Sequence, residues 1–397
     1  MEKISIHQKN QDIFSTSFTH QHLFEGSTND QTPNPTLRWS EQKANAWYKK
    51  NGWIVGCNYI PATAINQLEM WQEETFDPIT IDKELSWAAA LGFNTIRVFL
   101  HNLVWEQDHQ SYLRRIDWFL SIAAVHGIRT ILVLFDSVWD PNPSSGKQPD
   151  PRLHVHNSGW VQCPGYQVLN NTSRYEELHS YVHGIVDYFK NDDRVLLWDL
   201  FNEPDNMNLT SYKDDFYVQH KAELSMQLLQ KTIQWVRAIN PIQPITMAPW
   251  QWTSMETLSE LDNYMFNHSD IISFHCYENK KDTESRILSL KKFNRPMVCT
   301  EYMARALGST FQEILPLLKK YNVGACNWGL VQGKSQTHCC WNSWHNNTAN
   351  EPEQWFHDIL RPNGEPYDRA EEEFIKKVTR TEKKTSRKKT KADFQLI

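Results

Sequence analysis

The chain has 397 residues, a length that allows either two ordinary domains or a single α/β barrel with long loops. Its formal net charge is −6, but the segment from Lys376 onward holds nine Lys or Arg against two acidic residues, which leaves the rest at about −13. An acidic body argues against a nucleic-acid scaffold, because neutralising phosphates requires a basic face.

Three parts of the chain differ in composition. Residues 1–36 are polar and read as a flexible leader, residues 37–375 carry the pattern of a folded domain, and residues 376–397 form a basic tail that we expect to be disordered. No 18-residue apolar stretch and no signal-peptide apolar region is present, so we expect no membrane partner and, read literally, a cytoplasmic monomer. The seven Cys show no paired spacing, and we interpret most of them as small buried hydrophobes.

Eight short apolar runs alternate with helical stretches along residues 53–330. A run such as VLLWDLFN indicates a strand buried on both faces, as in a parallel sheet. The predicted strands are Trp53–Ile60, Phe93–Leu100, Ile128–Phe135, Val195–Asp205, Pro244–Trp250, Asp270–Tyr277, Pro296–Tyr302 and Asn322–Leu330. Predicted helices are Asp82–Leu91, Tyr112–His126, Tyr175–Asn191, Tyr217–Asn240, Asp282–Phe293, Ser309–Tyr321 and Ala370–Val378. This alternation predicts a closed (β/α)8 TIM barrel with long strand-end loops.

Polar residues end most of these strands, and in a barrel they converge on one rim. They are Arg97, His101, Asp136, Asn202, Glu203, His275, Tyr277, Glu301 and Trp328. Two carboxylates facing each other across a barrel are what glycoside hydrolysis requires, one as proton donor and the other as nucleophile or base. Glu203 and Glu301 are the candidates, because an unpaired carboxylate closing an apolar strand costs several kcal/mol if buried without purpose.

The ordered set of motifs N-E-P, H-x-Y and T-E-Y, followed by a Trp on the last strand, resembles the clan A glycoside hydrolases and is most similar to family 5, which includes cellulases and mannanases. The resemblance covers about residues 45–365. It implies that residues 37–375 are a catalytic domain that needs no cofactor and acts on an oligo- or polysaccharide. It also makes an extracellular location possible.

By that resemblance Glu203 is the general acid/base and Glu301 the nucleophile of a retaining double displacement, with the two carboxyl groups about 5 to 5.5 Å apart. Asn202 holds the sugar 2-hydroxyl, and Tyr277 and Arg97 hydrogen-bond Glu301. Further implied roles place His275 near the acid/base and Trp328 under the sugar next to the scissile bond.

The sequence departs from the family pattern at the end of the third strand. Family 5 enzymes usually have a His there, whereas this chain has Phe135-Asp136-Ser137. We expect His101, one strand earlier, to occupy similar space, and Asp136 to bind substrate. Aromatic faces suit the apolar faces of sugar rings, so the Trp residues of strand-end loops are candidate platforms. They are Trp139, Trp160, Trp250, Trp252, Trp341 and Trp344.

Other chemistry-bearing groups lie in the loops. His154 and His156 alternate, and His338-Cys339-Cys340 with His345 resembles a soft-metal cluster, but neither has a recognised zinc spacing, so we predict no metal. The sequence predicts a retaining hydrolase of a β-linked mannan, glucan or xylan. Two alternatives stay open, namely a barrel that binds carbohydrate with weak or no turnover and a transglycosylase that replaces water with a sugar acceptor.

Overall fold

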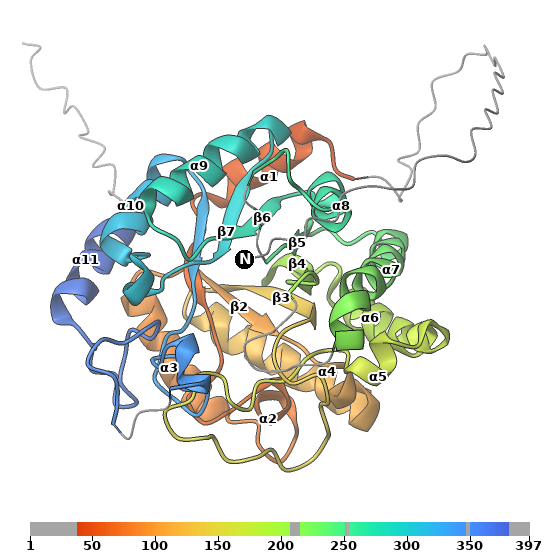
Figure 1. Ribbon diagram of the computed structural model, residues 1–397, viewed down its shortest axis with the longest axis horizontal. Helices are drawn as coiled ribbons and strands as arrows, with labels where there is room; N and C mark the ends of the chain where they lie inside the picture. The colour runs from red at the N-terminus through yellow and green to blue at the C-terminus, as the bar shows by residue number, and fades with distance from the viewer. Residues whose placement is uncertain (1–37, 207–214, 251, 253, 347–349, 381–397) are drawn as a thin grey trace, which may run out of the picture. The chain divides into compact units, whose positions relative to one another are not determined.

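Eight parallel strands curl into a barrel that helices surround (Figure 1). The computed structural model describes residues 38–206, 215–250, 252, 254–346 and 350–380. The strands are β1 (Val55–Asn58), β2 (Thr95–Phe99), β3 (Arg129–Asp136), β4 (Val195–Asn202), β5 (Ile245–Ala248), β6 (Ile272–His275), β7 (Met297–Glu301) and β8 (Gly324–Asn327). Each lies within a predicted run or overruns it by one residue, and the predicted TIM-barrel fold is confirmed.

The strand order is β5-β4-β3-β2-β1-β8-β7-β6, so consecutive strands pair from β1 to β5 and from β6 to β8, and β1 pairs with β8. The seam between β5 and β6 is bridged by the Asp270 N–H, which donates to the Ile245 carbonyl at 2.9 Å. The Thr246 hydroxyl also donates to the Ile271 carbonyl at 2.7 Å. These bonds nearly close the barrel and leave little unpaired strand edge.

The helices of the described residues are α1 (Glu41–Asn51), α2 (Gln67–Trp71), α3 (Pro78–Ala90), α4 (Asn102–Val125), α5 (Tyr166–Leu169), α6 (Tyr175–Phe189), α7 (Asp215–Ile239), α8 (Glu260–His268), α9 (Lys280–Leu290), α10 (Phe311–Lys320) and α11 (Arg369–Thr379). All seven predicted helices are present. Side-chain caps start several of them, as where Asp77 accepts from the Thr80 N–H before α3. No described helix is long and apolar enough to cross a membrane.

Four of the described helices were not predicted, namely α1, α2, α5 and α8, and α4 begins much earlier than predicted. The predicted Tyr112 start of α4 lies ten residues inside the observed helix, because Asp108 has non-helical backbone angles that join two helical pieces. The sequence pattern recognises the second piece, whose start Asp108 caps by accepting from the Ser111 N–H at 3.0 Å.

Helix α1 packs against the N-terminal end of the barrel. Its buried Ala44 and Tyr48 form a cluster with Ile54, Ile131 and Leu197. Apolar side chains therefore fill the N-terminal end of the barrel. The opposite end, where the C-terminal strand ends meet, carries the long loops and the polar residues.

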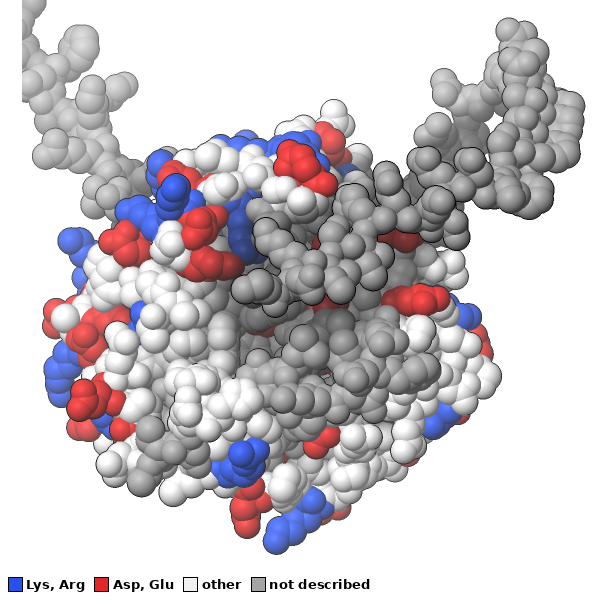
Figure 2. Space-filling view, in the orientation of Figure 1, with Lys and Arg blue, Asp and Glu red and all other residues white. Residues whose placement is uncertain are grey.

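The predicted leader, residues 1–36, and residues 381–397 of the predicted tail lie outside the described residues. Helix α11 continues through Thr379, whose hydroxyl donates to the Leu91 carbonyl at 2.7 Å, so the folded part of the chain extends past residue 375. On the face shown in Figure 2, acidic and basic side chains of the described residues are intermingled around the outer edge of the view.

Candidate active site

Strand register brings the predicted rim residues into adjacent pairs. Asp136 on β3 lies opposite Asn202 on β4, and His275 on β6 lies opposite Glu301 on β7. Because all eight strands are parallel, these pairs share the C-terminal rim of the barrel. Every residue of β4, β6 and β7 is buried, so the strands provide rigid mounts.

Glu203 directly follows β4 in a turn with a left-handed backbone (φ 47°), which is uncommon for a residue with a side chain. Its N–H donates to the Ala248 carbonyl at 2.8 Å and so ties the turn to β5. One carboxyl oxygen contacts His275 Nδ1 at 2.6 Å, and the other accepts from Asn206 Nδ2 at 2.8 Å. Burial raises the pKa of Glu203 to about 8, although the Asn206 bond opposes this shift.

Glu301 ends β7 and receives two strong donors. Arg97 Nη1 donates to its Oε1 at 2.9 Å, and the Tyr277 hydroxyl donates to its Oε2 at 2.7 Å. Burial raises the pKa of Glu301 to about 7, while His275, Arg97 and Tyr277 act in the opposite direction. The two carboxyl groups thus differ in environment, and Glu203 has the higher pKa.

The two carboxylates lie close together with His275 between them. One oxygen of Glu203, one of Glu301 and a ring nitrogen of His275 all lie within 4.8 Å of one another. Burial lowers the pKa of His275 to about 3, so its imidazole is neutral at ordinary pH. A single proton therefore occupies the contact between Glu203 Oε1 and His275 Nδ1.

Arg97 is fully buried and connects the site to the barrel interior. Besides Glu301, its guanidinium donates to Asp199 Oδ2 at 2.9 and 3.0 Å, to Asn58 Oδ1 at 2.7 Å and to Asn202 Oδ1 at 2.6 Å. This fork fixes the orientation of Glu301 and Asn202 relative to each other.

Asn202 and Asp136 form the other half of the rim. The Asn202 amide nitrogen donates to Asp136 Oδ1 at 3.0 Å, and Trp160 Nε1 donates to Asp136 Oδ2 at 2.7 Å. Burial raises the pKa of Asp136 to about 6. Arg97 holds the Asn202 amide oxygen, and among the described residues the amide nitrogen donates only to Asp136, so its second N–H remains available to a ligand.

These groups line a cavity of about 380 Å³ with aromatic walls. Trp328, after β8, packs edge-on against Phe99 and Trp160. Trp250, after β5, contacts Tyr277 and the loop residue Trp341, with ring centroids 6.1 and 5.9 Å apart. The rest of the lining comes from Asp136, Val138, Trp139, His156, Asn157, Trp160, Asn202, Glu203, Asp205, Asn206, Tyr277, Glu301 and His357.

Sequence reasoning missed several of these wall residues. Asn157 Oδ1 and His357 Nε2 are buried and have no hydrogen-bond partner among the described residues, so they are available to ligand hydroxyls. Asn206 holds Glu203, and its carbonyl accepts from the buried Lys221 at 2.5 Å. Their only sequence signal was their place in long loops after strands β3, β4 and β8.

The prediction that His101 lies in the site is wrong. Its Nδ1 accepts from the Leu103 N–H at the start of α4, and its Nε2 contacts the Gln162 carbonyl at 3.0 Å. Burial lowers its pKa to about 4, and it is not among the cavity-lining residues. His101 is therefore a neutral helix cap whose two ring nitrogens are already used.

Within the part of the chain that the structure describes, two groups of side chains have the composition of a metal site. In Glu203, His275 and Glu301, the Arg97 guanidinium already neutralises the carboxylate of Glu301, which disfavours a second cation. The other group is His154, His338 and Cys339. His156 is not part of it and lines the aromatic cavity instead.

Comparisons with solved structures show the same fold. The exo-β-1,4-mannosidase Op5Man5 from Opitutaceae bacterium strain TAV5 is 18% identical with a TM-score of 0.53, over 82% of this chain and 59% of that one. A GH5_18 protein from Streptomyces cattleya, solved with GlcNAc, is 11% identical with a TM-score of 0.53, over 82% and 79%. The endo-β-1,4-mannanase from Thermotoga petrophila is 12% identical with a TM-score of 0.52, over 83% and 76%.

This chain thus spans less than two thirds of the length of the Opitutaceae protein. No curated protein sequence matches it significantly. The family description "Cellulase (glycosyl hydrolase family 5)" matches residues 60–347, well over half of the chain. That range contains Glu203, Glu301, Arg97 and every residue that lines the aromatic cavity except His357. The chain belongs to glycosyl hydrolase family 5 and is a glycosidase.

Proposed function

We propose that the protein is a retaining glycosidase that hydrolyses a β-linked glycan of the mannan, glucan or xylan type. The observation that carries this proposal is the spacing of Glu203 and Glu301, whose nearest oxygens lie within 4.8 Å. Retaining enzymes hold their carboxyl groups about 5 to 5.5 Å apart, whereas inverting enzymes need about 6.5 to 9.5 Å to admit a water.

The difference in environment supports a different role for each carboxyl group. Glu203, with its pKa raised to about 8, is protonated at neutral pH and gives its proton to the leaving glycosidic oxygen. Glu301 attacks the anomeric carbon and forms a glycosyl-enzyme ester as the bond to the leaving group breaks. Glu203, now a carboxylate, takes a proton from water, and that water displaces Glu301 with a second inversion.

The other rim residues bind and orient the sugar. The free N–H of Asn202 donates to the 2-hydroxyl, and Asp136 accepts from a neighbouring hydroxyl. Trp328 and Trp250 offer apolar faces to the rings on either side of the scissile bond. His275 positions Glu203 through the 2.6 Å contact between its Nδ1 and Glu203 Oε1.

The experiment is a release assay on a panel of β-1,4-mannan, β-glucan, xylan and aryl β-glycosides. Wild type should release reducing sugar from at least one substrate, whereas Glu203→Gln and Glu301→Gln should each lose most of that activity. NMR of the first-formed product should show the β-anomer, as retention requires. Full activity of Glu301→Gln, or a first-formed α-anomer, would contradict the mechanism.

Product analysis separates the alternatives. Longer oligosaccharides at high substrate concentration would identify a transglycosylase, and binding without product across the whole panel would identify a carbohydrate-binding barrel. The mannosidase and mannanase named above share the fold, so β-mannosides are the first substrates on the panel.

A further inference from the structure

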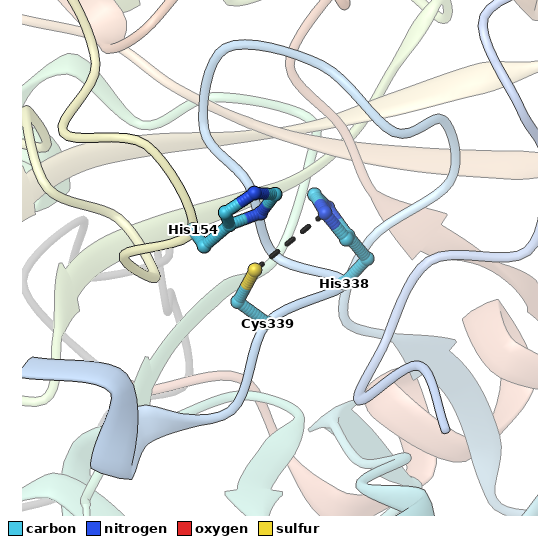
Figure 3. A group of neighbouring side chains, drawn as sticks. All are labelled: His154, His338 and Cys339. Carbon is cyan, nitrogen blue, oxygen red and sulfur yellow. Dashed lines mark hydrogen bonds between the residues drawn. The ribbon is translucent and has the colours of Figure 1, made fainter. Parts of the chain in front are cut away.

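We propose that His154, His338 and Cys339 form a zinc-type metal site that joins two loops behind the active-site wall. Figure 3 shows the three side chains converging from two separate segments, with His154 opposite the adjacent pair His338 and Cys339. One candidate ligand atom from each lies within 4.8 Å of the other two. Two imidazoles and one thiolate are a donor set that suits Zn²⁺.

The distances already approach those of a bound metal. Cys339 Sγ lies 3.5 Å from His338 Nε2. Zn–S and Zn–N bonds of about 2.3 and 2.0 to 2.1 Å in a tetrahedron place sulfur and nitrogen about 3.5 to 3.6 Å apart. His154 closes the triangle after a movement of about 1 Å, estimated from the same bond lengths.

Unpaired buried atoms around the cluster are the second, independent observation. Among the described residues, His154 Nδ1, His338 Nδ1 and Asp358 Oδ2 are buried without a hydrogen-bond partner. Asp358 Oδ2 lies 3.8 Å from His338 Nδ1, the ring nitrogen that does not face Cys339. Metal-bound histidines commonly donate their second N–H to a carboxylate, and a shift of about 1 Å would bring these two atoms within hydrogen-bond distance. A metal bound to His338 Nε2 therefore gives a role to both His338 Nδ1 and Asp358 Oδ2.

The backbone and the surroundings fit a built site. His154 has a left-handed backbone (φ 60°), and its N–H donates to Gln336 Oε1 at 2.6 Å, which holds it toward the second loop. His154 and His338 also line a cavity of about 500 Å³, which gives the metal an entry path and leaves a fourth position for water. On binding, Cys339 releases its thiol proton to solvent and becomes the thiolate ligand.

The consequence concerns the active-site wall. His156, two residues from His154, contacts the Cys339 carbonyl at 2.8 Å, and Trp341 follows two residues after Cys339. Both His156 and Trp341 line the catalytic cavity. A metal bridging the loops therefore fixes the spacing of this wall without taking part in the reaction.

The test uses the full-length protein, stripped with chelator and titrated with Zn²⁺ or Co²⁺. We expect one equivalent to bind, the melting temperature to rise, and Co²⁺ to produce thiolate-to-cobalt charge-transfer absorption. Cys339→Ser should abolish that absorption, whereas Cys340→Ser, at the exposed neighbouring cysteine, should leave it unchanged.

Two further variants guard against a folding defect. His154→Asn keeps a residue that tolerates the left-handed backbone and should weaken Zn²⁺ binding by more than about tenfold. Asp358→Asn should weaken it by about 10- to 100-fold, the usual effect of losing an outer partner. The proposal is overturned if wild type shows no sulfur-to-cobalt absorption, if Cys339→Ser retains it, or if zinc binding is the same in His154→Asn. Zinc held by Glu203, His275 and Glu301 would give that last result.

Discussion

Replacing Tyr277 by Phe removes one hydroxyl and tests whether Glu301 acts as an ionised nucleophile. The hydroxyl donates to Glu301 Oε2 at 2.7 Å, and His275 Nδ1 lies 3.5 Å from the same oxygen. A hydrogen bond to a charged group contributes about 1.5 to 3 kcal/mol, and about 1.4 kcal/mol corresponds to one pKa unit. Losing a donor destabilises the carboxylate, so the pKa of Glu301 should rise from about 7 by roughly one unit.

The rate should change in a pH-dependent way. At pH 6 the ionised fraction of Glu301 falls from about one tenth to about one hundredth for a one-unit rise, so kcat/KM on the acid side should drop about tenfold. At pH 9 both proteins have an ionised Glu301, and the loss should nearly disappear. The assay is kcat/KM against pH on an aryl β-glycoside, where the acid limb should move to higher pH.

The matched control is Tyr302→Phe. Its hydroxyl is also buried, but it has no hydrogen-bond partner among the described residues, so the acid limb should stay where it is in wild type. An acid limb that does not move in Tyr277→Phe, or that moves to lower pH, would refute the assignment of Glu301 as a carboxylate stabilised by this bond.

Two further changes address stability. Arg97→Met leaves Asp199 buried without its cation and should lower the free energy of unfolding, measured in urea, by about 3 to 5 kcal/mol. The control Arg174→Met breaks an exposed ion pair and should lower it by about 1 kcal/mol or less. Equal losses in the two variants would contradict the structural role of the buried Arg97 guanidinium. Glu203 has a native pKa of about 8 against an ordinary 4.5, so the native state keeps a proton that the unfolded chain releases, and stability falls as pH rises from about 4.5 to 8. Glu203→Gln lacks this decline, so the melting temperature of the variant minus that of wild type should increase from pH 5 to pH 9. If this difference in melting temperature does not change with pH, the raised pKa of Glu203 is contradicted.

Strand ends were predictable from sequence because they depend on local pattern. The apolar run from Val195 predicts β4, and Pro204 marks its end, so the position of Glu203 follows from about ten residues. The same logic located Glu301, and parallel register then brought the two together. Helix α1 was missed because it is polar along most of its length and buries few side chains, Ala44 and Tyr48.

His101 shows why individual side chains are harder to place. His101 lies at the C-terminal end of β2 much as Asn202 lies at the end of β4, yet both of its ring nitrogens already contact protein groups, the Leu103 N–H and the Gln162 carbonyl. Gln162 lies 61 residues away in a long loop whose path no local pattern specifies. The wall residue His357 and the cluster of His154 with Cys339 depend on the same kind of long-range contact.

The two halves of the site are therefore held by different forces. The Arg97 fork fixes Glu301 and Asn202, and the bond from the Glu203 N–H to the Ala248 carbonyl ties Glu203 to β5, so the geometry proposed for catalysis depends mainly on the barrel. The aromatic wall instead depends on side chains that bridge loops, such as the Trp139 and Trp344 rings stacked with centroids 5.6 Å apart. Loop changes can consequently alter which sugar fits while the reaction is preserved, and substrate preference is to be sought in the wall and not in the carboxylates.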